Sequence, residues 1–395
     1  MPTAEIIDKV NAKKEYLKSN RESIKQYLES VQDVDKDFTN LSLQEIKEYN
    51  NANSPMDAVN FFRKRSLEIM STNFLAEFLK PVAIDEDAKD NNPLYGIPIS
   101  IKEVMSIKGL DSTLGLGKQC QSPKEFTSTI IKVLQHLGAI PFMTTSAAQG
   151  GLSVDSSNPV FGSQENPRFK GFLAGGSSGG EGIAISLGAS PIGIGSDIGG
   201  SIRFPAAFNG ICGLKPTTNR LSLSGHFEIS DHNPITFRVV IGPLGRRVDD
   251  LADFFRAVLC DYHFQLDPTV VPIKFNEDAF NPSGGKLRIG FYTDFNELNF
   301  PHTAPSVAQA IERAAEIMKE LGHEVKPFQI PDLDEGLRLA IGCLFADGGQ
   351  ALKDAYKNEI LDECNKETSN LLLIPRFLRK LFGRFVMRSY GAFVS

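Results

Sequence analysis

The sequence predicts an α/β protein with a largely parallel or mixed central sheet flanked by helices. From residue 94 onward, segments with the two-residue period of strands alternate with segments that have the period of helices. Such alternation packs as a sheet covered by helices. A second observation is a glycine-dense stretch, with 13 glycines in the 43 residues from Gly171 to Gly213. Because glycine costs backbone entropy, this density indicates loops that turn sharply or approach another group closely.

Residues 1–90 form a predicted N-terminal helical region. Ser42 and Glu45 make a capping box, and Ser54 directly before Pro55 is a second helix start. We expect this region to be a packing layer without chemistry of its own. Residues 91–350 are expected to form the core that holds the site, and residues 351–395 a C-terminal region of amphipathic helices.

The predicted core elements follow one another in a regular order. Tyr95–Lys102 is strand-like, with its isoleucines on one face. After it come a helix over 127–137 that stops at Gly138, strands over 139–144 and 191–195 separated by a helix over 181–187, and then a strand over 286–292 and a helix over 306–321. We expect the last helix to direct these apolar side chains inward: Val307, Ile311, Ala314, Met318 and Leu321.

The composition is that of a globular protein and argues against several functions. Of 395 residues, 41% are apolar and 23% charged, and the net charge is −6. Because phosphate binding needs clustered Lys and Arg, and the first 370 residues contain no long basic run, we expect no nucleic-acid partner. The five cysteines are odd in number and widely scattered, and no C-x-x-C motif occurs among them. We expect reduced thiols in a cytosolic compartment.

The N-terminus lacks the apolar core of a signal peptide, and no window reaches the length of a transmembrane helix. We therefore expect a soluble or peripheral protein.

A Ser-Ser-Lys hydrolase needs two serines and a lysine, and the sequence offers Lys102, Ser177 and Ser201 as candidates. Serine needs a nearby base to take its proton. None of the six histidines lies in either serine-glycine loop, and a Gly-x-Ser-x-Gly nucleophile elbow is absent. Lys102 is the alternative base, provided that burial holds it neutral. A solvated lysine on the face opposite the isoleucines is the simpler interpretation of Lys102 taken alone.

The two glycine loops allow two interpretations. The backbone N–H groups of Ile198, Gly199, Gly200 and Ser201 can converge on one oxygen and form an oxyanion hole. Gly175–Gly180 can instead be a phosphate loop, but it lacks the Gly-Lys-Ser/Thr ending of Walker loops.

Longer motifs give a specific resemblance to a known family. Gly175–Gly180, Gly195–Pro205 and Cys212–Pro216 occur in order and at the right gaps, and together they resemble the amidase signature. Within the amidase-signature family the chain is most similar to the fatty acid amide hydrolases. That similarity lies in four segments: Tyr95–Glu103, Lys108–Leu116, Ser157–Gly162 and Leu266–Pro272. The resemblance runs from about residue 20 to the C-terminus and implies the amidase-signature fold, with a mixed twisted sheet.

The resemblance also implies a role for each candidate residue. Ser201 is the expected nucleophile, Ser177 the proton relay and Lys102 the ultimate base and acid. The N–H groups from Ile198 to Ser201 are expected to hold the oxyanion. The remaining expectations are that Ser178, Asp197 and Arg203 support the site, and that Gly151 and Leu152 border an acyl-binding region.

The stretch from Leu371 to Phe385 is both apolar and basic, and basic residues recur in it every four positions from Arg376 onward. Such a helix lies in a bilayer interface, although the residues alone leave open a core-packing helix with a solvated basic edge. The resemblance favours the interface, because the family has a membrane-facing cap at this point. It implies a cytoplasmic protein that is peripheral on intracellular membranes.

The resemblance therefore implies a serine amidase that hydrolyses long-chain fatty acid amides through an acyl-enzyme, with neither a metal nor a cofactor. Two alternatives stay open: the same triad acting on small amides or esters, and a catalytically impaired, shortened form that binds membranes. The family's core continues beyond the cap, so we expect a fold that is incomplete at the C-terminus. A homodimer also stays open.

Overall fold

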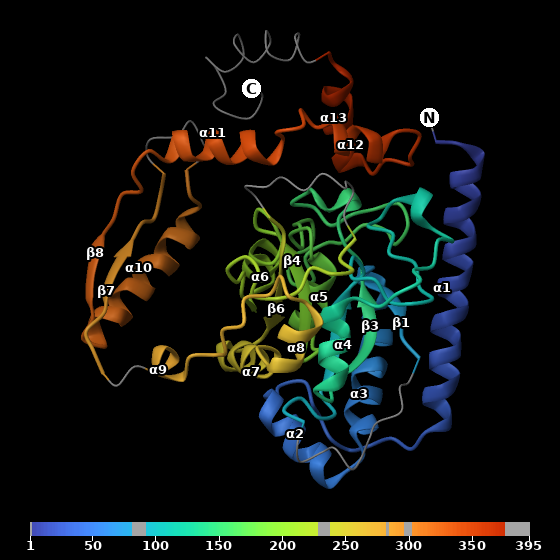
Figure 1. Cartoon of the computed structure of the whole chain (residues 1–395), viewed down its shortest axis with the longest axis horizontal. Coiled ribbons are helices and arrows are strands. Elements are labelled where there is room, and N and C mark those ends of the chain that lie inside the picture. Colours follow the sequence, from blue (N-terminus) through green and yellow to red (C-terminus); the bar gives the residue numbers. More distant parts are fainter. Residues whose placement is uncertain (1, 81–91, 228–237, 282–283, 296–301, 376–395) are drawn as a thin grey trace. The chain divides into compact units, whose positions relative to one another are not determined.

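The computed structural model describes residues 2–80, 92–227, 238–281, 284–295 and 302–375 (Figure 1). The chain divides into two units. The larger unit comprises Met1–Asn233, Arg238–Phe275 and Ala351–Ser369, and the smaller unit comprises Pro234–Phe237, Asn276–Gln350 and Asn370–Ser395.

A six-stranded mixed sheet forms the centre of the larger unit, which confirms the predicted fold class. The strand order is β1-β3-β2-β4-β6-β5. The central strand β2 pairs in parallel with β3 and with β4, whereas β1 and β6 run antiparallel to their neighbours. The strands are β1 Leu75–Phe78, β2 Pro98–Lys102, β3 Ile140–Thr145, β4 Ile192–Asp197, β5 Cys212–Gly213 and β6 Val240–Gly245.

Helices surround this sheet, and local signals in the sequence set their ends. Ser42 and Glu45 form both bonds of the predicted capping box, and Ser54 caps the helix that begins at Pro55. Gly138 adopts a φ of +86°, the left-handed conformation that ends a helix. The helices are α1 Ala4–Ser30, α2 Leu43–Ala52, α3 Pro55–Glu68, α4 Thr129–His136, α5 Gly179–Ser186, α6 Arg203–Asn209, α7 Val248–Val258, α8 Asp261–Leu266, α12 Gln350–Tyr356 and α13 Glu363–Leu373, with short 3₁₀ turns η1 Met70–Thr72, η3 Gly117–Gln119 and η4 Gln149–Gly151.

The strand β1 lies inside the region predicted to be entirely helical, so that prediction is wrong for Leu75–Phe78. All four of its residues are buried, and such a short strand shows no alternation by which the sequence could reveal it. β1 is an edge strand, and α1 runs along its outer side (Figure 1). The side-chain amide of Asn20 both donates to the carbonyl of Phe78 and accepts from its N–H, which satisfies part of the open edge.

The smaller unit contains a two-stranded parallel sheet, with β7 Arg288–Phe291 and β8 Glu324–Pro327. Its helices are α9 Glu277–Phe280, α10 Pro305–Glu320 and α11 Leu333–Leu344. The strand and helix positions agree with the prediction, but the inward direction of the apolar side chains of α10 does not. In the described structure Val307 and Leu321 are 51% and 66% exposed, and Ala315 is the buried residue of the helix. Two four-residue strands offer too little surface to cover a 16-residue helix.

Among the described residues, no helix combines the length and the apolar character needed to cross a membrane. The predicted interfacial helix falls mostly on residues 376–395, which lie outside the described residues.

A buried ion cluster fastens α1 to the sheet. The ammonium group of Lys13 lies 3.2 Å from a carboxylate oxygen of Glu77 in β1 and 3.1 Å from one of Asp111. Burial alone would lower the pKa of Lys13, but the two carboxylates raise it overall. The lysine is 5% exposed, so water cannot replace either partner.

We therefore predict that Lys13→Met destabilises the larger unit by about 3 kcal/mol or more, because it leaves two buried carboxylates without their cation. Lys9 provides a matched control one turn earlier in the same helix, since it pairs with an exposed Glu5. Lys9→Met should cost less than about 0.5 kcal/mol. Unfolding in urea measures both, and equal midpoints for the two variants would show that the cluster does not fasten α1.

Candidate active site

Lys102 ends the central strand β2, and its side chain is 1% exposed. Its ammonium nitrogen lies 2.8 Å from the hydroxyl oxygen of Ser177 and 3.1 Å from that of Ser196. The interpretation of Lys102 as a solvated lysine is therefore wrong. Strand alternation placed it correctly on the face opposite the isoleucines, but in this sheet that face is buried as well.

Ser177 lies in the loop that leads into α5 and is 2% exposed. The peptide bond between Gly176 and Ser177 is cis. A Cβ at Gly176 would lie 2.4 Å from the carbonyl oxygen of Ser153, so this loop needs glycine in order to pass so close to its neighbour. The carbonyl of Ser177 in turn accepts a hydrogen bond from the N–H of Ala148.

Ser201 lies in the loop after β4 and is half-buried. Its carbonyl accepts the N–H of Ser178 at 3.1 Å, which brings the second glycine loop against the first. The hydroxyl of Ser178 donates to the carbonyl of Ser196 at 3.3 Å, a second link between the loops. Within the described residues, no hydrogen bond joins the hydroxyl of Ser201 to that of Ser177. The structure thus brings Lys102 and Ser177 into contact and places Ser201 on the adjoining loop.

Asp197, at the end of β4, organises the turn that carries Ser201. Its carboxylate accepts the N–H groups of Gly200 at 2.8 Å and Ile202 at 3.0 Å, and both guanidinium contacts from Arg203 measure 3.0 Å. Burial would raise the pKa of Asp197, but these hydrogen bonds and the charge of Arg203 lower it overall, so the carboxylate is held ionised. The supporting role expected of Asp197 and Arg203 stays a prediction.

This arrangement changes the list of candidate oxyanion donors. The N–H of Gly200 already donates to Asp197, so that group is occupied. The N–H groups of Gly199 and Ser201 donate to none of the described residues. Gly200 has a φ of +128° and lies against the ring of Phe204, where a Cβ would have no room. Its contribution is therefore the shape of the turn.

Burial also sets the charge of Lys102. It lowers the pKa of the amine from 10.5 to about 7, although the carboxylates of Asp197, Glu103 and Glu181 act in the opposite direction. A lysine with this pKa is neutral in a large fraction of molecules at neutral pH. The site can therefore supply a base of the kind that serine requires.

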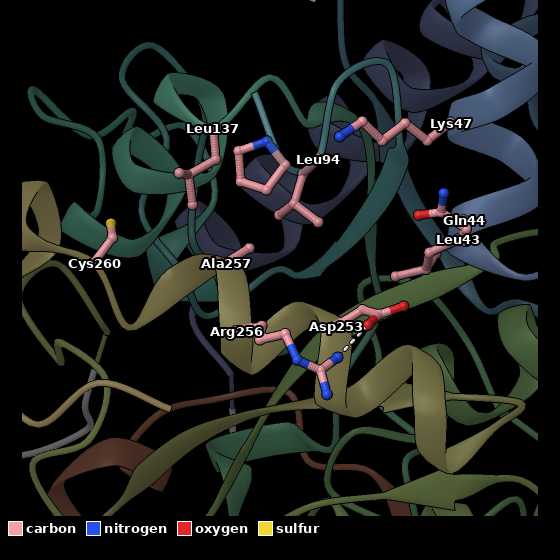
Figure 2. Close-up of a pocket in the computed structure, with 10 residues that line it drawn as sticks. Leu43, Gln44, Lys47, Leu94, Leu137, Asp253, Arg256, Ala257 and Cys260 are labelled. Atoms are coloured by element: carbon pink, nitrogen blue, oxygen red, sulfur yellow. Dashed lines mark hydrogen bonds and ion pairs between the residues drawn. The ribbon is translucent and has the colours of Figure 1, made fainter. Parts of the chain in front are cut away.

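Gly151 and Leu152 lie just after the segment that contacts Ser177. Gly151 ends η4 with a φ of +73°, and a Cβ there would be 3.4 Å from the side chain of Leu114. Both residues are half-buried. A cavity of about 540 Å³ lies elsewhere in the larger unit, and none of the predicted site residues lines it (Figure 2). Its walls come from α2, α7, Pro93, Leu94, Leu137 and Cys260.

Two polar residues of the site, Ser196 and Glu181, were not predicted from the sequence. Ser196 contacts Lys102 and lies directly before Asp197, so its position beside a predicted supporting residue was an available signal. Glu181 is fully buried in a helix whose other residues are small or apolar. An isolated acid in such a helix indicates a buried carboxyl with specific partners, so the sequence did contain a signal for Glu181. In the part of the chain that the structure describes, no group of His, Cys, Asp and Glu is arranged to hold a metal ion.

The fold and these contacts define an α/β protein with a buried lysine beneath two serine-glycine loops. The model of the family described as Amidase matches residues 67–392, and the chain belongs to this family. It is 42% identical over 297 residues to fatty-acid amide hydrolase 1 of Sus scrofa, with 75% of this chain and 50% of that protein covered. It is 40% identical over 295 residues to vitamin D3 hydroxylase-associated protein of Gallus gallus, with coverages of 74% and 62%.

Among solved structures, one described as fatty acid amide hydrolase superposes with a TM-score of 0.77 over 98% of this chain and 77% of that one. At 24% identity this likeness shows the fold. The chain spans about half to three fifths of the length of the curated relatives that it matches.

We predict that Asp197→Asn destabilises the larger unit by about 1 to 3 kcal/mol, because an amide has one acceptor where the carboxylate has two and carries no charge for Arg203. Arg203→Gln is the matched control from the other side of the pair. The Arg203 side chain is 51% exposed, so water replaces its partner and the loss should be smaller. Thermal unfolding of both variants gives the comparison, and an equal or larger loss in Arg203→Gln would contradict the role assigned to Asp197.

Proposed function

We propose that this chain carries the catalytic site of a serine amidase that acts on long-chain fatty acid amides. The observation that carries the proposal is the 2.8 Å contact between the buried amine of Lys102 and the hydroxyl of Ser177. A lysine in such a place is a base, and a serine hydroxyl bonded to it can pass a proton on. Membership of the amidase family supports the reaction class.

In the proposed first half-reaction, neutral Lys102 takes a proton from Ser177 while Ser177 takes one from Ser201. The oxygen of Ser201 attacks the amide carbonyl, and the negative charge that develops on the carbonyl oxygen is stabilised by backbone N–H groups of the Ile198–Ser201 turn. The proton then returns from Lys102 through Ser177 to the departing nitrogen. This return matters because an amide nitrogen leaves only after it is protonated.

In the second half-reaction, water attacks the acyl group on Ser201, and the same relay accepts its proton. Ser201 is regenerated and the fatty acid leaves. Lys102 serves as base in the attack and as acid in the departure, which requires a pKa near the working pH. The lowered pKa of about 7 meets this requirement.

Two lines support a lipid amide as the substrate and a membrane surface as the place of action. The relative from Sus scrofa carries the name fatty-acid amide hydrolase 1. At the end of α13 the described structure also leaves apolar side chains exposed: Leu371 by 37%, Leu373 by 64% and Ile374 by 38%. In the sequence they lead directly into the basic, apolar stretch that ends at Phe385. A sequence in which exposed apolar residues are followed by apolar and basic ones suits a bilayer with anionic lipids.

We predict that a fluorophosphonate probe labels purified protein on Ser201, because the proposed relay activates this hydroxyl. Mass mapping identifies the site. Ser201→Ala should abolish labelling, and Lys102→Met should slow it at least about 100-fold, the usual contribution of a general base. Absence of an adduct in folded native protein would contradict the proposal, as would an adduct on another serine.

A substrate series then separates the proposed substrate from the alternative of small amides or esters. Fatty acid amides with acyl chains of 2 to 20 carbons, presented with and without anionic vesicles, are the substrates. The proposal expects kcat/KM to rise with chain length and the native protein to float with the vesicles. Preference for the shortest amides would favour the alternative substrate class, and flotation without hydrolysis would favour the impaired, membrane-binding form.

A further inference from the structure

A second buried ionisable group lies beside the candidate base. Glu181, in the first turn of α5, is 0% exposed. One of its carboxylate oxygens accepts the hydroxyl of Ser100 at 2.5 Å, and the other accepts the hydroxyl of Thr145 at 2.7 Å. Both partners belong to the central sheet, so α5 holds this carboxyl directly against β2 and β3.

The two partners of Glu181 define where it lies relative to Lys102. Ser100 precedes Lys102 by two residues in β2, and residues two apart point to the same face of a strand. Thr145 is the cross-strand neighbour of Lys102 in the parallel register of β2 and β3. A carboxyl bonded to both therefore lies on the face that carries the Lys102 side chain, within about 5 to 7 Å of that residue's backbone.

The neighbouring strand is shaped to admit this carboxyl. Gly193 in β4 is the register partner of Ser100. A Cβ at Gly193 would lie 1.8 Å from a carboxylate oxygen of Glu181 and 2.5 Å from the hydroxyl of Ser100. Gly193 is not among the residues with a positive φ, so its backbone conformation does not require glycine. The space that it leaves is what the carboxyl occupies.

Glu181 differs from the other acids that act on Lys102. Asp197 is bound by Arg203, and Glu103 accepts the backbone N–H of Thr113 at 2.8 Å in addition to the hydroxyl of the same residue at 3.2 Å. Neither a guanidinium nor a backbone N–H can accept a hydrogen bond from a protonated carboxyl group. The protein partners of Glu181 are two hydroxyl groups, which can donate to a carboxylate or accept from a carboxylic acid. Burial raises the pKa of Glu181 to about 7, against the effect of Ser100, Thr145 and Lys102. His226 is a further titratable group that interacts with Lys102, and burial together with Lys102 lowers its pKa to about 3, so it is neutral throughout the relevant range.

We propose that Glu181 is a positioning residue that governs the charge of Lys102. The two groups form one buried pair in which the protonation state of each depends on that of the other. Ionised Glu181 favours the ammonium form of Lys102, which is the form that protonates the departing amine. Protonated Glu181 favours the free amine, which is the form that accepts the proton of serine. The inference rests on the proposed function, since it assigns a regulator to the base of that reaction.

The test is the pH dependence of fluorophosphonate labelling of Ser201 between pH 5 and 9, in native protein and in Glu181→Gln. Native labelling should rise with pH through about 7, as Lys102 loses its proton. Glutamine keeps the shape and can bond both hydroxyls, but it removes the negative charge. The midpoint of the rise should therefore move to lower pH by about 1 unit, the lower end of the shift that one nearby opposite charge produces.

Two further variants make the result specific. Thr145→Val removes one hydrogen bond that favours ionised Glu181, so it should move the midpoint in the same direction by a smaller amount. This variant replaces Glu181→Gln in the test if Glu181→Gln does not fold. Glu359 is a buried acid that accepts the N–H groups of Gly117 and Lys118 and is not among the groups that shift the pKa of Lys102. Glu359→Gln should leave the midpoint unchanged.

A midpoint in Glu181→Gln within 0.2 units of the native value, ~0.3 kcal/mol in the protonation of Lys102, would overturn the inference while leaving the proposed function intact. Absence of labelling in the native protein would instead count against the proposed function. In that event the side-chain resonance of Lys102 decides the inference, because its titration midpoint must still be lower in Glu181→Gln than in the native protein.

Discussion

The burial of Lys102 at the end of β2 is the constraint on which the rest of the larger unit depends. An ammonium group without water is costly, and it is tolerated only if it loses its proton or finds compensating charge and hydrogen bonds. The protein uses both means: the pKa falls to about 7, and two serine hydroxyls and three carboxylates surround the amine. The result is an amine that changes charge near neutral pH at a position that is 1% exposed.

The glycine-dense loops follow from the same constraint. To reach a buried lysine, a serine must be carried by backbone that comes closer to the sheet than a side chain would permit. Gly176 passes against the carbonyl of Ser153, Gly200 against the ring of Phe204, and Gly193 against the carboxyl of Glu181. At each of these glycines, a polar group or an aromatic ring occupies the space that a Cβ would need. The density of glycine is thus a consequence of packing loops, strand and helix around one charged centre.

These relationships explain which features could be predicted from the sequence. Capping signals such as Ser42 with Glu45, and the helix stop at Gly138, act through neighbouring residues and were predicted correctly. The contact of Lys102 with Ser177 was anticipated through the family resemblance, whereas strand alternation alone favoured a solvated lysine. Burial on both faces of β2, the strand β1 and the place of Glu181 depend on residues distant in the sequence, so no local pattern contains them. The exposure of the apolar side chains of α10 could not be predicted either, because a helical period indicates an apolar face but not whether another element covers it.

The central claim, that Lys102 is a base poised near neutral pH, is tested most directly by its own titration. Protein labelled with ¹³C and ¹⁵N in its lysine side chains, compared with Lys102→Met, identifies the Lys102 resonance in an NMR spectrum. We expect it to titrate with a midpoint near 7, more than three units below an ordinary lysine at 10.5. A midpoint near 10.5, with the amine charged at every pH from 5 to 9, would contradict the account.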